Sequence, residues 1–196
     1  VPGSAPLRGR VVIAGLGPAG LFCAYALAKR GYAPLVVERG EPVERRAQSV
    51  SRFWDGGGLN RESNVMFGEG GAGTFSDGKL TSRSKDPRQA FVLDTLARFG
   101  APKEIRIDAK PHIGTDKLRQ TVSSLRREIE RLGGEVAFST RLEGVETADG
   151  AVCAVRLTDA QGTRRIDCGA LVLAIGQGAR DTYEALFAAG VAMQQK

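Results

Sequence analysis

The chain has 196 residues, 42% of them hydrophobic and 26% charged, which is the composition of an ordinary globular domain with a core of its own. No apolar run approaches the ~18–20 residues of a membrane-spanning helix, and the first residues carry no signal-peptide pattern. The formal net charge is +6, but the basic residues are dispersed among acids. This argues against a nucleic-acid surface and is compatible with a phosphate-bearing cofactor or an anionic substrate.

The cysteines and the histidine exclude further kinds of site. Cys23, Cys153 and Cys168 share no C-x-x-C spacing. We interpret all three as small buried residues in a reducing compartment, the cytoplasm, and not as a redox pair. His112 is the only histidine, so no metal site is expected.

A glycine-rich turn follows a linker and the first predicted strand. Residues 1–9 are rich in proline and glycine and predict the linker, and residues 10–196 predict one domain. Val11–Ala14 is apolar throughout, as a strand buried on both faces of a parallel sheet would be. The G-x-G-x-x-G pattern that follows permits a tight turn, close approach of a pyrophosphate and close packing of a helix. The residues expected around that pyrophosphate are Gly15, Gly17, Pro18, Ala19 and Gly20.

The next helix and strand supply the context that this motif needs. A helix is predicted over Leu21 to Arg30 and a second apolar strand over Leu35–Val37, which ends in Glu38. Glu38 lies 38 − 15 = 23 positions after the first glycine, close to the spacing of a carboxylate that accepts from ribose hydroxyls. The alternative is an ordinary turn before a surface helix, with Glu38 solvated.

A glycine-rich segment follows a predicted helix over Val43 to Trp54. Residues 67–80 contain many glycines but also Phe67 and Phe75, which favour an ordered loop over a flexible linker. The glycines would let the backbone approach a ligand closely, and the N–H groups could form an anion-binding concavity. Lys79 could place a cation near a bound ligand, or it could be an ordinary solvated lysine.

The middle of the chain predicts two helices and two strands. The first helix begins at Pro87 and is followed by a half-exposed strand over Glu104–Asp108. His112 lies in a loop, where a structural role and a ligand-facing role are both open. Thr115 is expected to cap a helix whose apolar stripe runs to Leu132, and a strand is expected over Glu135 to Thr140.

The last third predicts an antiparallel meander and a return to the parallel sheet. The three meander strands are Leu142 to Thr147, Ala151 to Thr158 and Thr163 to Cys168, with a hairpin turn at Asp149-Gly150. Ala170 to Ile175 reads as another buried parallel strand, and it ends in a second glycine turn at Gly176. Asp181 is expected to cap the last helix.

Together these elements predict an α/β fold: a Rossmann-like FAD/NAD(P)-binding domain, with a parallel sheet, helices on both faces and an inserted antiparallel β-meander. Such a sheet binds its ligand outside the carboxyl ends of its strands, where the two glycine turns and Glu38 converge. Glu38 argues against a 2′-phosphate, because two anions would repel. FAD and NAD remain open, with S-adenosylmethionine as a weaker alternative.

The chain resembles FAD-dependent oxidoreductases with a glutathione-reductase-type flavin domain. The fingerprint of that family extends to an alanine, a leucine, a glycine and an acid, which are here Ala24, Leu27, Gly31 and Glu38. The meander and the Leu173-Ala174-Ile175-Gly176 segment are also similar to elements of that family. The resemblance implies FAD as cofactor and implies contacts with it from Arg39, Leu142, Ala174 and Gly176.

A closer resemblance is to bacterial uncharacterised FAD-dependent dehydrogenases, through residues 67–80 and the His112-Ile-Gly-Thr-Asp-Lys-Leu segment. It implies that part of the loop lies along the pyrophosphate and flavin, namely Gly70, Gly71, Ala72, Gly73 and Thr74. Members of these families also have a substrate domain and a late Gly-Asp pair for the ribityl chain. Neither is recognisable here, so we expect both beyond Lys196.

The sequence therefore predicts the N-terminal flavin-binding part of an FAD-dependent oxidoreductase that transfers hydride or electrons. No side chain qualifies as an acid, base or nucleophile, so no catalytic residue is named. The expected partners are a small-molecule substrate or an electron donor or acceptor, with no nucleic acid and no membrane; the oligomeric state is open. Two alternatives remain: an NAD-binding oxidoreductase on the same fold, and a non-catalytic flavin-binding protein.

Overall fold

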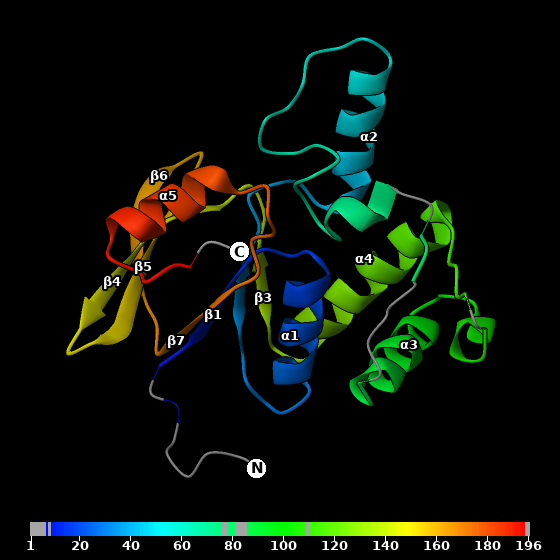
Figure 1. Ribbon diagram of the computed structural model, residues 1–196, viewed down its shortest axis with the longest axis horizontal. Helices are drawn as coiled ribbons and strands as arrows, with labels where there is room; N and C mark the ends of the chain where they lie inside the picture. The colour runs from blue at the N-terminus through cyan, green and yellow to red at the C-terminus, as the bar shows by residue number, and fades with distance from the viewer. Residues whose placement is uncertain (1–6, 8, 76–77, 81–85, 109, 195–196) are drawn as a thin grey trace.

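The structure is a computed structural model, and it describes residues 7, 9–75, 78–80, 86–108 and 110–194 (Figure 1). Its strands are β1 (Val11–Ala14), β2 (Leu35–Val37), β3 (Glu135–Ala137), β4 (Arg141–Ala148), β5 (Ala151–Asp159), β6 (Gly162–Asp167) and β7 (Ala170–Leu173). Its helices are α1 (Pro18–Ala28), α2 (Val43–Trp54), α3 (Arg88–Arg98), α4 (Thr115–Arg131) and α5 (Arg180–Ala188), with 3₁₀ turns η1 (Ala72–Phe75) and η2 (Lys103–Arg106). Within the described residues, no helix has the length and apolar character needed to cross a membrane.

A four-stranded parallel sheet in the order β3-β2-β1-β7 forms the centre of the fold. Strand β1 is buried along its whole length, because its residues alternate between two apolar layers. Val11 and Ile13 face a core built from α1, α3 and α4. Val12 and Ala14 face a second core built from the antiparallel strands and Leu186 of α5. Figure 1 shows these two layers on opposite sides of the sheet, which confirms the predicted fold class.

The predicted meander is present as a three-stranded antiparallel sheet in the order β4-β5-β6. Its first hairpin turns at Asp149 and Gly150, whose φ angles of 52° and 75° are those that the Asp-Gly signal predicts. Strand β5 is central, and its core face carries Val155 and Leu157, both fully buried. The meander thus closes one face of the parallel sheet and contributes half of the second core.

One predicted element is wrong: the segment over Glu104–Asp108 is not a strand but contains the 3₁₀ turn η2. Pro102 immediately precedes the turn, and no strand of the described chain pairs with it. Ile105 is buried against the first core, whereas Ile107 is 86% exposed. The polar–apolar alternation was therefore too short to distinguish a strand from a turn that buries one isoleucine.

Helix starts and two strand lengths also differ from the expectations. Helix α4 has its apolar stripe as predicted, but its N-cap is Gly114, and Thr115 is its first residue. Helix α5 has Ala179 as N-cap, and Asp181 lies in its first turn. Strand β3 ends at Ala137, because Ser139 adopts a φ of 49° that turns the chain toward β4. Strand β7 ends at Leu173 and is only half-buried, because it lies at the edge of the sheet.

The cysteines are less uniformly buried than expected, and some predicted segments lie outside the described residues. Cys168 is buried as expected, but Cys23 and Cys153 are half-buried. Most of the predicted linker lies outside the described residues, as do Ser76 and Asp77 of the glycine-rich loop.

Candidate functional site

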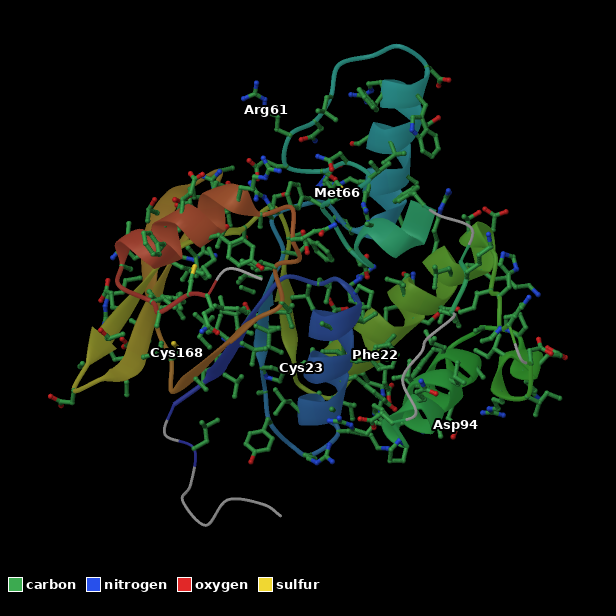
Figure 2. The ribbon with its side chains drawn as sticks, viewed as in Figure 1. Phe22, Cys23, Arg61, Met66, Asp94 and Cys168 are labelled. Atoms are coloured by element: carbon green, nitrogen blue, oxygen red, sulfur yellow. The ribbon has the colours of Figure 1, made fainter. Side chains whose placement is uncertain are left out.

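A cavity of about 480 Å³ opens at the carboxyl ends of β1, β2 and β7. Its walls come from the first glycine turn, the end of β2, the segment between α2 and η1, the turn into β4, and the chain from β7 into α5. In Figure 2 the labelled Met66 marks the segment between α2 and η1, which approaches the sheet at this edge. The sequence predicted a ligand site at this edge, and the cavity lies there.

The cavity brings together most of the predicted cofactor residues but not all of them. Those that line it are Gly15, Gly17, Pro18, Ala19, Glu38, Arg39, Gly71, Ala72, Leu142, Ala174 and Gly176. Gly20, Gly70, Gly73 and Thr74 are not part of its lining. Lys79 and His112 are not part of it either, and they pair with each other in a short antiparallel bridge.

Two positions of the first glycine motif must be glycine because backbone atoms of the protein lie too close for a side chain. Gly15 has a φ of +99°, and a Cβ there would lie 2.4 Å from the carbonyl oxygen of Ala174. A Cβ at Gly20 would lie 1.9 Å from the carbonyl oxygen of Gly15. The turn can therefore lie against the end of β7, and α1 against the turn, only because these side chains are absent.

Gly17 is different, because no neighbour among the described residues requires it to be glycine. Its φ of −69° suits any residue, and a Cβ would have no neighbour closer than the Gly71 Cα, at 3.8 Å. A side chain at this position would project into the cavity. Gly17 is also the N-cap of α1 and makes no side-chain cap, so the N–H groups of the first turn, at Ala19 and Gly20, have no intrahelical acceptor. An anion can approach the N–H groups of a helix start closely where no side chain stands in the way, and Gly17 meets that condition.

Glu38 is buried, with 4% of its surface exposed, and its carboxylate accepts three backbone hydrogen bonds. One oxygen accepts from the N–H of Leu16 at 2.7 Å, and the other accepts from those of Gly40 at 2.8 Å and Gly68 at 3.0 Å. The carboxylate thus joins the first glycine turn to the loop after α2. A carboxylate offers about four acceptor positions, so one remains for a ligand hydroxyl at the cavity wall. The ribose contact expected of Glu38 stays a prediction.

Arg46 of α2 holds the loop after α2 from the inside, a role that the sequence had not indicated. It is fully buried, and its guanidinium donates to four backbone carbonyls. The acceptors are Asn64 at 2.9 Å, Val65 at 3.2 Å, Gly68 at 3.3 Å and Glu69 at 2.6 Å. Burial lowers the pKa of Arg46 to about 10, against the attraction of two nearby carboxylates.

Glu69 fixes the same loop to two helices. Its fully buried carboxylate accepts from the N–H of Val43 at 2.8 Å and from Arg126 of α4 at 2.8 Å. Burial raises the pKa of Glu69, although both hydrogen bonds act in the opposite direction. The adjacent Gly70 donates its N–H to the carbonyl of Leu16 at 2.9 Å, so the loop lies directly on the glycine turn.

Arg39 closes one end of the cavity through a pair of ion contacts. It binds Asp181 of α5 in a bidentate pair at 2.9 and 2.8 Å and Glu62 at 2.8 Å, while its guanidinium lies 4.3 Å from the centre of the Phe67 ring. Burial alone would lower the pKa of Arg39, but the hydrogen bonds to both carboxylates outweigh it and raise the pKa above its usual value. The hydrogen bond from Arg39 likewise lowers the pKa of Asp181. The pair ties α5 to the end of β2.

The predicted loop residues 70–74 divide into two groups. Gly71 and Ala72 face the cavity, next to Gly17. Gly70 has a φ of +84°, and a Cβ there would lie 2.1 Å from the hydroxyl of Thr74, which is buried and has no hydrogen-bond partner among the described residues. Gly70 and Thr74 therefore shape the loop from behind and do not line the cavity.

The comparisons with known proteins agree with this geometry. A family model described as FAD binding domain matches residues 8–180. An uncharacterized protein of Clostridium beijerinckii is 51% identical over 194 residues, which are 99% of this chain and 36% of that protein. The chain therefore spans about a third of the length of the curated relative that it matches.

Two solved structures are similar to the chain as a fold. Thermovibrio ammonificans THI4 has a TM-score of 0.58 at 18% identity, over 95% of this chain and 64% of that one. The 3-ketosteroid-delta4-(5alpha)-dehydrogenase from Rhodococcus jostii RHA1 has a TM-score of 0.55 at 16% identity, over 84% of this chain and 45% of that one. The family match confirms FAD among the cofactors that the sequence left open, and the solved structures confirm the fold.

Proposed function

We propose, because the chain belongs to the family of FAD-binding domains, that it forms the part of an FAD-dependent oxidoreductase that holds the ADP half of the cofactor. The observation that carries the proposal is Gly17. Packing within the part of the chain that the structure describes does not require a glycine there, yet the position lies on the cavity wall beside the first-turn N–H groups of α1, which have no intrahelical acceptor. A pyrophosphate at this place accounts for both features.

The residues present fit the adenosine and pyrophosphate parts of FAD. The first-turn N–H groups of α1 would bind the pyrophosphate, and the remaining acceptor position of Glu38 would take a ribose hydroxyl. Arg39 and Leu142 also lie on the cavity wall and would border the adenine. Gly71, Ala72 and Gly176 would lie along the phosphates on the other side.

The bound flavin supplies the chemistry, which is to accept and donate hydride or electrons. The residues of this chain would bind the cofactor, orient it and exclude water from its phosphates. We assign no acid, base or nucleophile among the described residues.

We extend the proposal to a glutathione-reductase-type flavin domain spanning residues 10–196 of a cytoplasmic protein. The extended fingerprint supports it: Ala24 is fully buried in the first core, and Gly31, with a φ of +83°, follows the end of α1. We propose that this chain is the flavin-binding part of a longer protein, because it spans only 36% of the curated relative that it matches.

Substitution of Gly17 separates ligand binding from folding. In a titration followed by flavin absorbance near ~450 nm, we expect the chain to bind FAD and Gly17→Val to weaken binding about 100-fold, or about 2.7 kcal/mol. The unfolding midpoint should fall only slightly, because a Cβ at Gly17 has no neighbour closer than the Gly71 Cα at 3.8 Å, although valine is a poorer N-cap than glycine. The matched control is Gly58→Val, since Gly58 has open space around it but lies outside the cavity.

Two outcomes would contradict the proposal. One is a folded Gly17→Val variant that binds FAD as tightly as the parent chain. The other is a parent chain that binds NADH and leaves FAD free, which would favour the NAD-binding alternative. Reduction of an electron acceptor by the longer protein then separates an enzyme from a non-catalytic flavin-binding protein.

A further inference from the structure

Two of the three cysteines lie opposite each other in the antiparallel sheet. The pairing of β5 with β6 places Ala154 opposite Asp167, so the next pair along the two strands is Cys153 and Cys168. The N–H of Cys168 donates to the carbonyl of Cys153 at 3.0 Å, which shows that the pairing continues to these residues. Figure 2 labels Cys168 at the point where the chain leaves this sheet for β7.

Residues directly opposite on antiparallel strands point to the same face, with their Cα atoms about 4.5–5.5 Å apart. A disulfide needs Cα atoms about 4.4–6.8 Å apart, and the separation of an opposite pair falls within that range. The thiol of Cys153 currently contacts the carbonyl of Glu146 at 3.4 Å. A thiol is a weak donor, so this contact holds the Cys153 sulfur only weakly, and the side chain is free to adopt another staggered rotamer.

The two thiols differ in access. Cys153 is half-buried, whereas Cys168 has only 5% of its surface exposed. Burial raises the pKa of the Cys168 thiol, and the neighbouring Cys153 raises it further. An oxidant from solution therefore meets Cys153 first, and Cys168 is placed to react second.

We propose that Cys153 and Cys168 form a reversible cross-strand disulfide, with a small-molecule disulfide such as oxidised glutathione as the oxidant. The Cys153 thiolate attacks one glutathione sulfur, a mixed disulfide forms, and one glutathione leaves as a thiolate. The Cys168 thiolate then attacks the Cys153 sulfur and releases the second glutathione. The protein loses two protons and two electrons, and one oxidised glutathione becomes two reduced ones.

The disulfide would fix the junction between the meander and the parallel sheet. Gly169, the residue after Cys168, donates its N–H to the carbonyl of Arg10 at 2.9 Å, just before β1. A covalent bond at Cys168 would hold the end of β6 while the chain passes into β7. We expect the oxidised form to unfold at a midpoint about 5–10 °C above that of the reduced form.

The test uses Cys23→Ser as the background, so that only the proposed pair remains. This chain is incubated with oxidised glutathione, unfolded, alkylated with iodoacetamide and weighed by mass spectrometry. We expect a product lighter by two hydrogens, with no alkylated thiol and no glutathione, that returns to the starting mass with dithiothreitol. Adding Cys168→Ser should instead leave one glutathione attached at Cys153.

Two results would overturn the proposal. One is a product that carries two glutathiones, because the second thiol then reacts with solution and not with its neighbour. The other is complete alkylation of both thiols under conditions that form the disulfide in the urea-unfolded chain. An unchanged midpoint in a chain shown to be fully cross-linked would contradict the structural consequence.

Discussion

Replacing Glu38 by glutamine should destabilise the ligand-free protein. The carboxylate of Glu38 accepts from the N–H groups of Leu16, Gly40 and Gly68, and it is almost fully buried. Glutamine has the same shape but a single acceptor oxygen. If that oxygen accepts from the N–H groups of Gly40 and Gly68, the NH2 group of the glutamine lies against the N–H of Leu16. Both of these groups are donors, so no hydrogen bond can form between them.

The magnitude follows from these contacts. A hydrogen bond to a charged group contributes about 1.5–3 kcal/mol, and a buried donor left unpaired costs about 1–3 kcal/mol. The two effects overlap at Leu16, so Glu38→Gln should lower the free energy of unfolding by about 2–4 kcal/mol. Glu38→Ala leaves all three donors unpaired and should cost about 3–5 kcal/mol. The alanine variant should also bind FAD about 1–3 kcal/mol more weakly if Glu38 holds the ribose.

The assay is unfolding in urea followed by circular dichroism, with the slope of the transition checked against the parent chain. Glu135→Gln is the matched control, because Glu135 pairs with Arg10 outside the cavity, and the two side chains are 61% and 35% exposed. Exposed ion pairs contribute about 0–1 kcal/mol, so this control should stay within about 1 kcal/mol of the parent chain. A Glu38→Gln variant as stable as the control would refute the three-donor role of Glu38.

Further predictions concern the residues that hold the walls of the cavity. Arg46→Met leaves four backbone carbonyls without their donor and should lower the free energy of unfolding in urea by about 3–5 kcal/mol. A loss below about 1 kcal/mol would contradict the conclusion that Arg46 holds the loop after α2. Gly70→Ala places a Cβ on the Thr74 hydroxyl at a φ of +84°, so its unfolding midpoint should fall, whereas Gly58→Ala, which meets open space, should leave the midpoint unchanged. The pKa of Asp181 is lowered by Arg39, so the stability that their ion pair contributes is present above about pH 3.9, the usual aspartate value, and is lost as the pH falls through the lowered value. Asp181→Asn should remove that part of the acid dependence in urea unfolding, and an unchanged profile would contradict the pairing.

The parts of the fold that depend on neighbouring residues were predictable. The run from β1 through the glycine turn to Glu38 is local, because the turn, the helix and the second strand follow one another in the chain. The apolar Val11–Ala14 strand also indicated that both of its faces are covered. The short segment at Glu104 was not predictable, because one buried isoleucine suits a turn as well as a strand.

The parts of the site that depend on distant residues were not predictable. Glu38 accepts from Gly68, 30 positions away, and Arg39 pairs with Asp181, 142 positions away. Asp181 was expected to serve only as a helix cap. Arg46 gave one usable signal, since it lies at helical spacing between the buried Val43 and Val50, on a face where a charge needs partners.

The cysteine pair illustrates the same difference. Cys153 lies in β5, and Cys168 follows the end of β6, the next strand of the hairpin. Their spacing in the chain has no metal or redox pattern. Only the register of β5 against β6 places them opposite each other. A shift of that register by one residue would turn one thiol to the other face of the sheet.

The buried charges behind the loop after α2 have a consequence for ligand affinity. Residues 64–71 have no helix or strand, yet Arg46, Glu69 and Glu38 fix their backbone before any cofactor arrives. A loop that becomes ordered only on binding loses conformational entropy, and this cost makes the free energy of binding less favourable. Here the loop is already ordered in the folded protein, so the cofactor binds to a preorganised wall. The free energy of its contacts with that wall therefore contributes to affinity without being reduced by the cost of ordering the loop.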